Sequence, residues 1–372
     1  MTPGAPSTPA ATSSSPAPPA PMSTTSEPCW CADFGGFSGL WAKGRREPLI
    51  PATWTSGPDS TSKNLEQGLG PMSIRFDEVG QRLRAYRLGK RLSADQIAER
   101  IGVSRAAVYR LEKGEIVKIQ ALEALSDLLE VSLPSLLGVE VEYYSNALGF
   151  FERMRQLEDQ ATHIMGNFSP LSSLILSDRY MKFLRIMLME AIPAGENGRA
   201  GREDLIDRVL ELLVQRRDSF KKKRAPIVSI VGEQDLERIL RLGLIGRFDH
   251  STETLRERRA AARHEVEEIR DAMLDQPIGM QIGVIEGQPP TQTFQIYELG
   301  SKSTVTLSPY RLGDQPNISS GIALVTSAPE AIKSFTNTFL GEWQRARKGS
   351  EGAAVLQRIL DRTSKEETEG AF

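Results

Sequence analysis

The chain has 372 residues, enough for more than one domain, and its 46 Lys and Arg residues nearly balance its 48 Asp and Glu residues at a net charge of −2. The only cysteines are Cys29 and Cys31, which are separated by a single residue. Two such cysteines cannot form a disulfide framework or a Cys-based zinc cluster in the folded part. This cysteine usage is typical of proteins of the reducing cytoplasm. The sequence starts without the basic and apolar pattern of a signal peptide, and no segment is long and apolar enough to span a membrane.

Residues 1–71 are rich in Pro, Ser, Thr and Ala and have no apolar periodicity. Such a segment buries too little apolar surface to offset the entropy lost on ordering, so we predict a disordered, low-complexity extension. Trp30, Trp41 and Trp54 are unusual for a plain linker and leave two alternatives open. Either the extension contains a small binding motif, or translation starts further downstream; we favour Met72 as the start of the folded protein.

A helical domain is predicted over residues 72–138, with its first helix at 77–88, a fourth at 119–129 and a short fifth that begins near Pro134. The residues expected in its core are Val79, Leu83, Tyr86, Val108, Leu111, Leu122, Leu125, Leu129, Val131, Leu133, Leu136 and Leu137. This pattern predicts a five-helix, all-α domain.

The second and third helices of this domain carry the most specific pattern in the chain, over Leu92–Leu111. Ser93 can cap the second helix, and Gln96, three residues later, completes a capping box. Gly102 lies at a sharp turn that a side chain would resist, and Ser104 can cap the third helix. The pattern predicts two short helices that meet at a tight turn.

The third helix exposes Arg105, Ala106, Tyr109 and Arg110. Residues 82–113 contain nine cationic and three anionic side chains, a local net charge of +6 that attracts phosphate. A helix that presents two guanidinium groups, a methyl group and a phenol is suited to reading base edges in the major groove. These features together favour DNA binding over a plain helical bundle.

The segment from Val79 to Leu137 resembles the lambda-repressor-like (XRE) helix-turn-helix family. The resemblance is carried by RLR at 82–84, LSADQIAERIGVSRAAVYRLEKGE at 92–115 and LEALSDLLEVS at 122–132. It implies a transcriptional regulator that binds double-stranded DNA, as a homodimer on a palindromic operator. By position, the resemblance assigns base contacts to Arg105, Ala106, Tyr109 and Arg110, and phosphate contacts to Ser93, Ser104, Lys90, Arg91, Arg100 and Lys113. Ala94 stands where the family often has Gln, so we expect Arg91 or Arg100 to replace that phosphate contact.

A larger α+β domain is predicted over residues 140–347, because its strands are grouped between helices rather than alternating with them. Helices are expected at 143–164, 177–191, 203–220, 233–242, 252–274 and 329–347, and strands at 226–231, 278–285, 293–299, 304–307 and 321–326. Residues 348–372 are expected to form a charged tail with one short helix at 353–361. The order of elements is similar to that in the C-terminal domain of actinobacterial XRE-type regulators, which implies a role in sensing a small-molecule or protein effector, or in dimerisation.

Two apolar stripes in this domain have alternative interpretations. Tyr180, Phe183 and Met187, with neighbouring Met residues, are spaced either to fill the core or to line a ligand pocket, and we favour the core. The stripe along residues 252–274 packs either on this chain or on a second subunit, and we favour internal packing.

No pattern in the sequence supports catalysis. There is no phosphate-binding loop and no nucleophile elbow, and the helix that begins at His264 has Glu268 where a zinc protease needs its second His. We therefore predict no catalytic residue, metal or cofactor, and a cytoplasmic, nucleoid-associated protein that is not an enzyme. Two alternatives remain: an antitoxin-like protein-interaction module with secondary DNA binding, and an enzyme fused to a DNA-binding domain.

Overall fold

The computed structural model describes residues 75–115, 119–139, 141–167, 174–192, 199–223, 225–287, 292–313 and 315–370. All of these residues belong to one compact unit. The extension predicted over residues 1–71, with its Trp and Cys residues, and the proposed start at Met72 lie outside the described residues.

Five helices form the first part of the described chain: α3 (Phe76–Gly89), α4 (Ala94–Ile101), α5 (Arg105–Glu112), α6 (Ile119–Leu129) and α7 (Leu133–Leu137). Each occurs where the sequence predicts it, and local capping signals set the starts of α4, α5 and α7. Ser93 forms the full capping box with Gln96 at the start of α4, and Gly102 ends that helix in the left-handed region, at a φ of 70°. Pro134 lies in the first turn of α7.

The core of the five-helix domain contains the expected side chains. Val79, Leu83 and Tyr86 of α3 are buried, as is Val108 of α5. The residues Leu122, Leu125, Leu129 and Leu136 are also buried, and Leu111, Val131, Leu133 and Leu137 are partly buried against them. A Cβ atom at Gly80 would lie 2.5 Å from the carbonyl oxygen of Glu112, so this glycine lets the end of α5 pack closely on α3.

The second part is a mixed α/β domain built on an eight-stranded sheet in the order β1-β7-β6-β5-β2-β3-β4-β8. The strands are β1 (Val141–Tyr144), β2 (His163–Asn167), β3 (Ile227–Gly232), β4 (Met280–Ile285), β5 (Phe294–Leu299), β6 (Lys302–Leu307), β7 (Ala323–Thr326) and β8 (Arg347–Lys348). Strands β2, β3 and β4 are mutually parallel, and every other neighbouring pair is antiparallel. Of the four strands grouped in the α+β prediction, β5, β6 and β7 are antiparallel neighbours, whereas β4 lies parallel to β3. The parallel strands β2, β3 and β4, on the side of the sheet that ends at β8, do not follow from that prediction.

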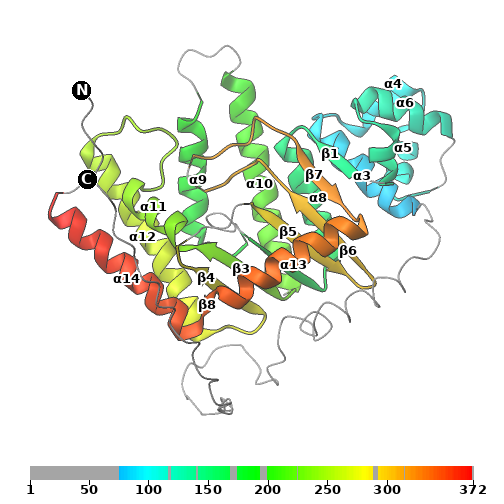
Figure 1. The fold of residues 1–372 in the computed structure, drawn as a ribbon. Coiled ribbons are helices and arrows are strands. Elements are labelled where there is room, and N and C mark those ends of the chain that lie inside the picture. The colour runs from blue at the N-terminus through cyan, green and yellow to red at the C-terminus, as the bar shows by residue number, and fades with distance from the viewer. Residues whose placement is uncertain are drawn as a thin grey trace, which may run out of the picture. The chain divides into compact units, whose positions relative to one another are not determined.

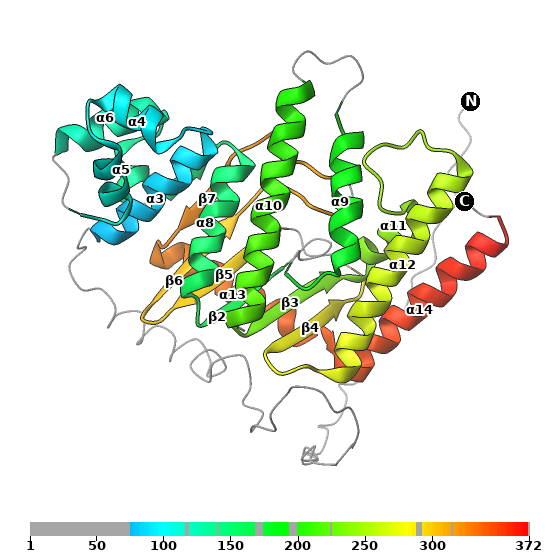
Figure 2. The ribbon, with the colours of Figure 1, turned by 180° about the vertical axis from the view of Figure 1, so that it is seen from behind.

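Helices cover both faces of this sheet. They are α8 (Ala147–Gln160), α9 (Asp178–Glu190), α10 (Arg199–Lys223), α11 (Glu233–Leu242), α12 (Thr252–Asp275), α13 (Pro329–Arg345) and α14 (Gly349–Thr368). Helix α13 crosses one face (Figure 1), where Phe339 and Ile332 pack on strand residues such as Met165 and Val305. Helices α8 and α10 cross the opposite face (Figure 2).

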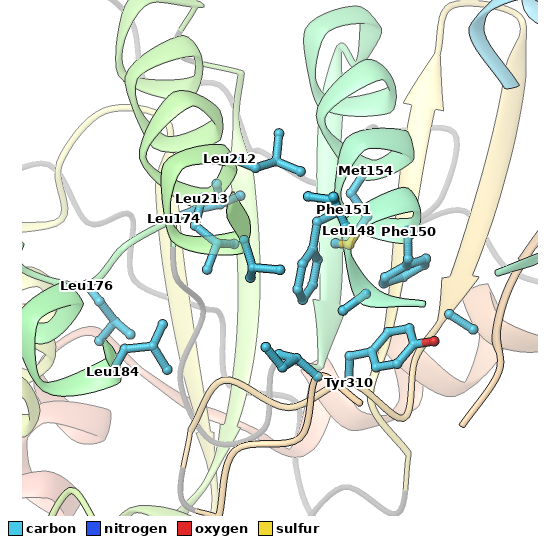
Figure 3. Close-up of a cluster of buried hydrophobic side chains, with 14 of the residues drawn as sticks. Leu148, Phe150, Phe151, Met154, Leu174, Leu176, Leu184, Leu212, Leu213 and Tyr310 are labelled. Carbon is cyan, nitrogen blue, oxygen red and sulfur yellow. The ribbon is translucent and has the colours of Figure 1, made fainter. Parts of the chain in front are cut away.

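A single apolar core connects this second face to the five-helix domain. In this core Tyr310 packs against Phe150 and Phe151 of α8, with ring centroids 5.9 and 6.3 Å away. Leu212 and Leu213 of α10 lie above these rings, and Leu184 of α9 lies further away, beside Leu176 (Figure 3). Tyr180 and Met187 are fully buried, so the core interpretation of the α9 stripe is confirmed. The α12 stripe packs internally against α11 and α14, as we favoured.

The helix predicted over residues 143–164 is confirmed only over Ala147–Gln160, and its predicted ends are wrong. The structure divides this segment into β1, α8 and β2. Asn146 starts α8 by accepting a 2.8 Å hydrogen bond from the backbone N–H of Gly149, and the extended backbone of Ala161 ends it. Strand β2 is buried at four of its five positions, so its sequence lacks the alternation that marks a half-exposed strand.

The charged tail predicted at residues 348–372 is also different in the structure. Residues 347–348 form β8 at the edge of the sheet, and α14 extends over twenty residues rather than the nine predicted at 353–361. One face of α14 buries Val355, Leu356 and Ile359 against α12 and α11. The many charged residues of this segment lie on the other face, which explains why its composition resembles that of a solvated tail.

Candidate nucleic-acid interface

Helix α5 presents all four predicted base-contacting residues to solvent. Arg105, Ala106, Tyr109 and Arg110 are exposed, while Val108 on the opposite side is fully buried. The Ser104 hydroxyl accepts a 3.1 Å hydrogen bond from the backbone N–H of Ala107, which holds the first turn of the helix. The orientation of the exposed face is therefore set by a cap and by burial of the opposite face.

The two arginines of α5 make only exposed polar contacts. Arg105 donates to the Tyr109 hydroxyl at 3.3 Å, and its Nη1 lies 3.5 Å from Asp95 Oδ2. The hydrogen bond to Tyr109 and the charge of Asp95 raise the pKa of Arg105, whose guanidinium group is positively charged at physiological pH even without this shift. Arg110 Nε lies 3.8 Å from Glu115 Oε2. Because exposed ion pairs contribute little energy, both guanidinium groups remain available to a ligand.

The six predicted phosphate-contacting residues lie in and around α4 and α5. Ser93 and Ser104 are the caps of these helices, so their positions are those predicted. Arg100 and Lys113 are exposed. Lys90 pairs with Glu130, and Arg91 contacts α10 in the α/β domain. Contact of any of these residues with DNA stays a prediction.

Two cations counted in the local charge are structural. The Arg82 side chain is buried and pairs with Glu78 and Glu142. Arg87 is also buried, donates from Nε and Nη2 to the Glu112 carboxylate, and donates from Nη1 to the carbonyl oxygen of Leu92. The positive charge available to a phosphate is therefore smaller than the net +6 counted from the sequence.

Sequence reasoning missed Glu142, a buried carboxylate at the junction of the two domains. Glu142 accepts a 2.8 Å hydrogen bond from Arg82 Nε and two 2.9 Å hydrogen bonds from Arg153 of α8. The Tyr144 hydroxyl donates a fourth, at 2.7 Å. Burial would raise the pKa of Glu142, but Arg153 and Arg82 outweigh burial and hold this pKa below its usual value. No local pattern marks Glu142, because Arg82 is 60 positions away.

The five-helix domain packs directly on α8 through α3. Tyr86 stacks on Tyr144 with ring centroids 4.7 Å apart, and a Cβ atom at Gly149 would lie 2.9 Å from the carbonyl oxygen of Ala85. The Gln156 side chain donates a 3.0 Å hydrogen bond to the carbonyl oxygen of Gln81. Within the described residues, the five-helix domain that contains α5 therefore shares one apolar core with the α/β domain.

Comparison with known proteins identifies this segment. Residues 78–137 match the model of a family described as a helix-turn-helix domain. This segment is a helix-turn-helix domain. The match covers 60 of the 372 residues, spans α3 to α7 and supports DNA binding by a regulator. No curated protein and no solved structure matches the chain.

No group of three His, Cys, Asp or Glu side chains is placed to hold a metal ion in the part of the chain that the structure describes. Glu265, beside His264, instead accepts hydrogen bonds from the backbone and hydroxyl of Ser177. Among the described helices, none is long and apolar enough to cross a bilayer.

Proposed function

We propose that this protein is a sequence-specific transcriptional regulator of the XRE type, which reads the major groove of double-stranded DNA with the helix Ser104–Leu111. The observation that carries the proposal is the exposed face of α5 within the matched helix-turn-helix domain. Arg105 and Arg110 each have the planar donor pair that recognises guanine O6 and N7, a contact worth about 1–3 kcal/mol of discrimination. The Ala106 methyl group is suited to the methyl group of thymine.

Phosphate contacts would position the helix in the groove without specifying sequence. The amides at the N-termini of α4 and α5, with the Ser93 and Ser104 hydroxyls, are suited to this role. Arg100 and Lys113 supply exposed positive charge. Binding is therefore expected to weaken steeply with salt, because each neutralised phosphate releases counterions.

In this proposal the regulator acts as a homodimer on a palindromic operator in the cytoplasm, associated with the nucleoid. One helix-turn-helix domain covers little of the groove, so two recognition helices about 34 Å apart would supply the affinity. The α/β domain is assigned to dimerisation or to sensing a small-molecule or protein effector. No enzymatic activity is proposed.

Selection of bound duplexes from a randomised library by the full chain tests this function. A recovered consensus with two symmetric half-sites, bound in gel-shift assays with a strong salt dependence, is the expected result. Recovery of no preferred duplex would contradict the proposal. A stoichiometric protein partner that co-purifies in the absence of any preferred duplex would instead favour the protein-interaction alternative.

A further inference from the structure

The α/β domain contacts the helix-turn-helix domain at a residue assigned to DNA binding. Arg91 lies in the turn between α3 and α4, two residues before the cap Ser93, and has a φ of 55°. Its Nη1 atom donates a 3.0 Å hydrogen bond to the carbonyl oxygen of Gly201 and lies 3.5 Å from Asp204 Oδ2. Both of these acceptors belong to the first two turns of α10.

The Asp204 carboxylate that Arg91 contacts has negatively charged oxygens that accept hydrogen bonds, as a phosphate has. A guanidinium group recognises carboxylate and phosphate oxygens with the same N–H donors, so the two acceptors compete for it. The side chains of Arg91 and Asp204 are 35% and 47% exposed, so an incoming phosphate can reach the pair. Asp204 also accepts a 2.9 Å hydrogen bond from Arg208, one turn further along α10, which holds the carboxylate in place.

We propose that Asp204 is an autoinhibitory competitor for DNA, which occupies Arg91 until a backbone phosphate of the bound duplex displaces it. This inference rests on the proposed function and adds its regulation. A movement of the N-terminal end of α10 would change how strongly Arg91 is held, so this contact is the point at which the α/β domain adjusts DNA affinity.

The chain offers a matched control for Asp204. Asp207 lies three residues later on α10, is 50% exposed and pairs with Arg185 of α9 at 2.9 Å rather than with the helix-turn-helix domain. Asp204→Asn and Asp207→Asn therefore remove the same charge from the same helix. We expect Asp204→Asn in the full chain to tighten binding to the selected duplex roughly two- to fivefold, as expected for the loss of an exposed pair, while Asp207→Asn leaves it unchanged.

The salt dependence gives a second readout. Arg91 contacts the same phosphate in wild type and in Asp204→Asn, so the slope of log affinity against log salt concentration is expected to be similar for both. Arg91→Ala is expected to flatten this slope by about 0.9, because it removes one phosphate contact. Equal affinities of Asp204→Asn and Asp207→Asn for the selected duplex, or an unchanged slope for Arg91→Ala, would overturn the proposal.

A double-mutant cycle identifies the cation that is released. Because Asp204 also pairs with Arg208, its removal frees two side chains. Arg91→Ala is expected to weaken binding to every duplex, because it removes a phosphate contact. In this background Asp204→Asn is expected to give no gain, since additivity fails only for coupled residues. A gain that persists without Arg91 would overturn the proposal while leaving DNA binding itself intact. If the wild-type chain and both Asn variants prefer no duplex, the proposed function fails as well.

Discussion

Arg82 of α3 and Glu142 of β1 are joined by a 2.8 Å hydrogen bond between two buried, charged side chains. This contact ties the helix-turn-helix domain to the sheet through residues 60 positions apart. With Arg153 on the other side of the carboxylate, it forms a network in which each charge has a partner. Burial makes such a network costly to break, so the junction behaves as part of the core.

Glu142→Gln is expected to destabilise the protein by about 3 kcal/mol or more, because Arg82 and Arg153 would remain buried without their shared carboxylate. Urea denaturation followed by circular dichroism measures the change. Glu123→Gln on the exposed side of α6 is the control and is expected to stay within about 0.5 kcal/mol of wild type. A loss below about 1 kcal/mol for Glu142→Gln would show that the network does not hold the junction.

Replacing either of two helical glycines, Gly149 or Gly341, with alanine is expected to change the stability of the protein in opposite directions. A Cβ atom at Gly149 would press on the carbonyl oxygen of Ala85, so Gly149→Ala is expected to lower stability by about 1–3 kcal/mol. A Cβ atom at Gly341 in α13 meets nothing within 4 Å, so Gly341→Ala is expected to raise stability by about 0.5–1 kcal/mol. Thermal unfolding compares the two variants, and a stabilised Gly149→Ala would contradict the close packing of α3 on α8.

The raised pKa of the Glu298 carboxyl group is expected to make the stability of the protein depend on pH. Burial raises the pKa of this carboxyl group from 4.5 to about 7, so the folded state binds a proton that the unfolded state has released. This contribution is present below about pH 4.5 and is lost as the pH rises towards 7. Glu298→Gln is therefore expected to gain stability relative to wild type as the pH increases from 5 to 8. Unfolding temperatures across this range measure the effect, and parallel curves for wild type and variant would contradict it.

Ser104 has a structural role and a predicted DNA contact, which two substitutions separate. Ser104→Ala removes the cap of α5 and is expected to cost about 1 kcal/mol of stability. Ser104→Asp keeps a capping oxygen and suits the helix dipole, so stability is expected to be preserved. Its negative charge would repel phosphate and weaken binding to every duplex. Unchanged DNA affinity for Ser104→Asp would show that no phosphate lies near this cap.

The parts of the fold that could be predicted from sequence are those set by local signals. The Ser93 capping box and Gly102 define both ends of α4, and burial of Val108 orients the exposed face of α5. The junction could not be predicted, because Glu142 meets Arg82 only after β1 pairs with β7 and α8 packs on α3. Short edge strands such as β1 carry too few residues to show a period, and they were missed or absorbed into neighbouring helices.

The measurement that tests the central claim most directly is the binding of Arg105→Ala to a randomised duplex library, beside wild type and Arg100→Ala. If Arg105 reads a base edge, its variant loses preference at particular positions, by about 1–3 kcal/mol at each, and keeps it elsewhere. Arg100→Ala, which removes an exposed charge assigned to phosphate, weakens binding evenly across sequences. An even loss of affinity across the library for Arg105→Ala would contradict base reading by α5.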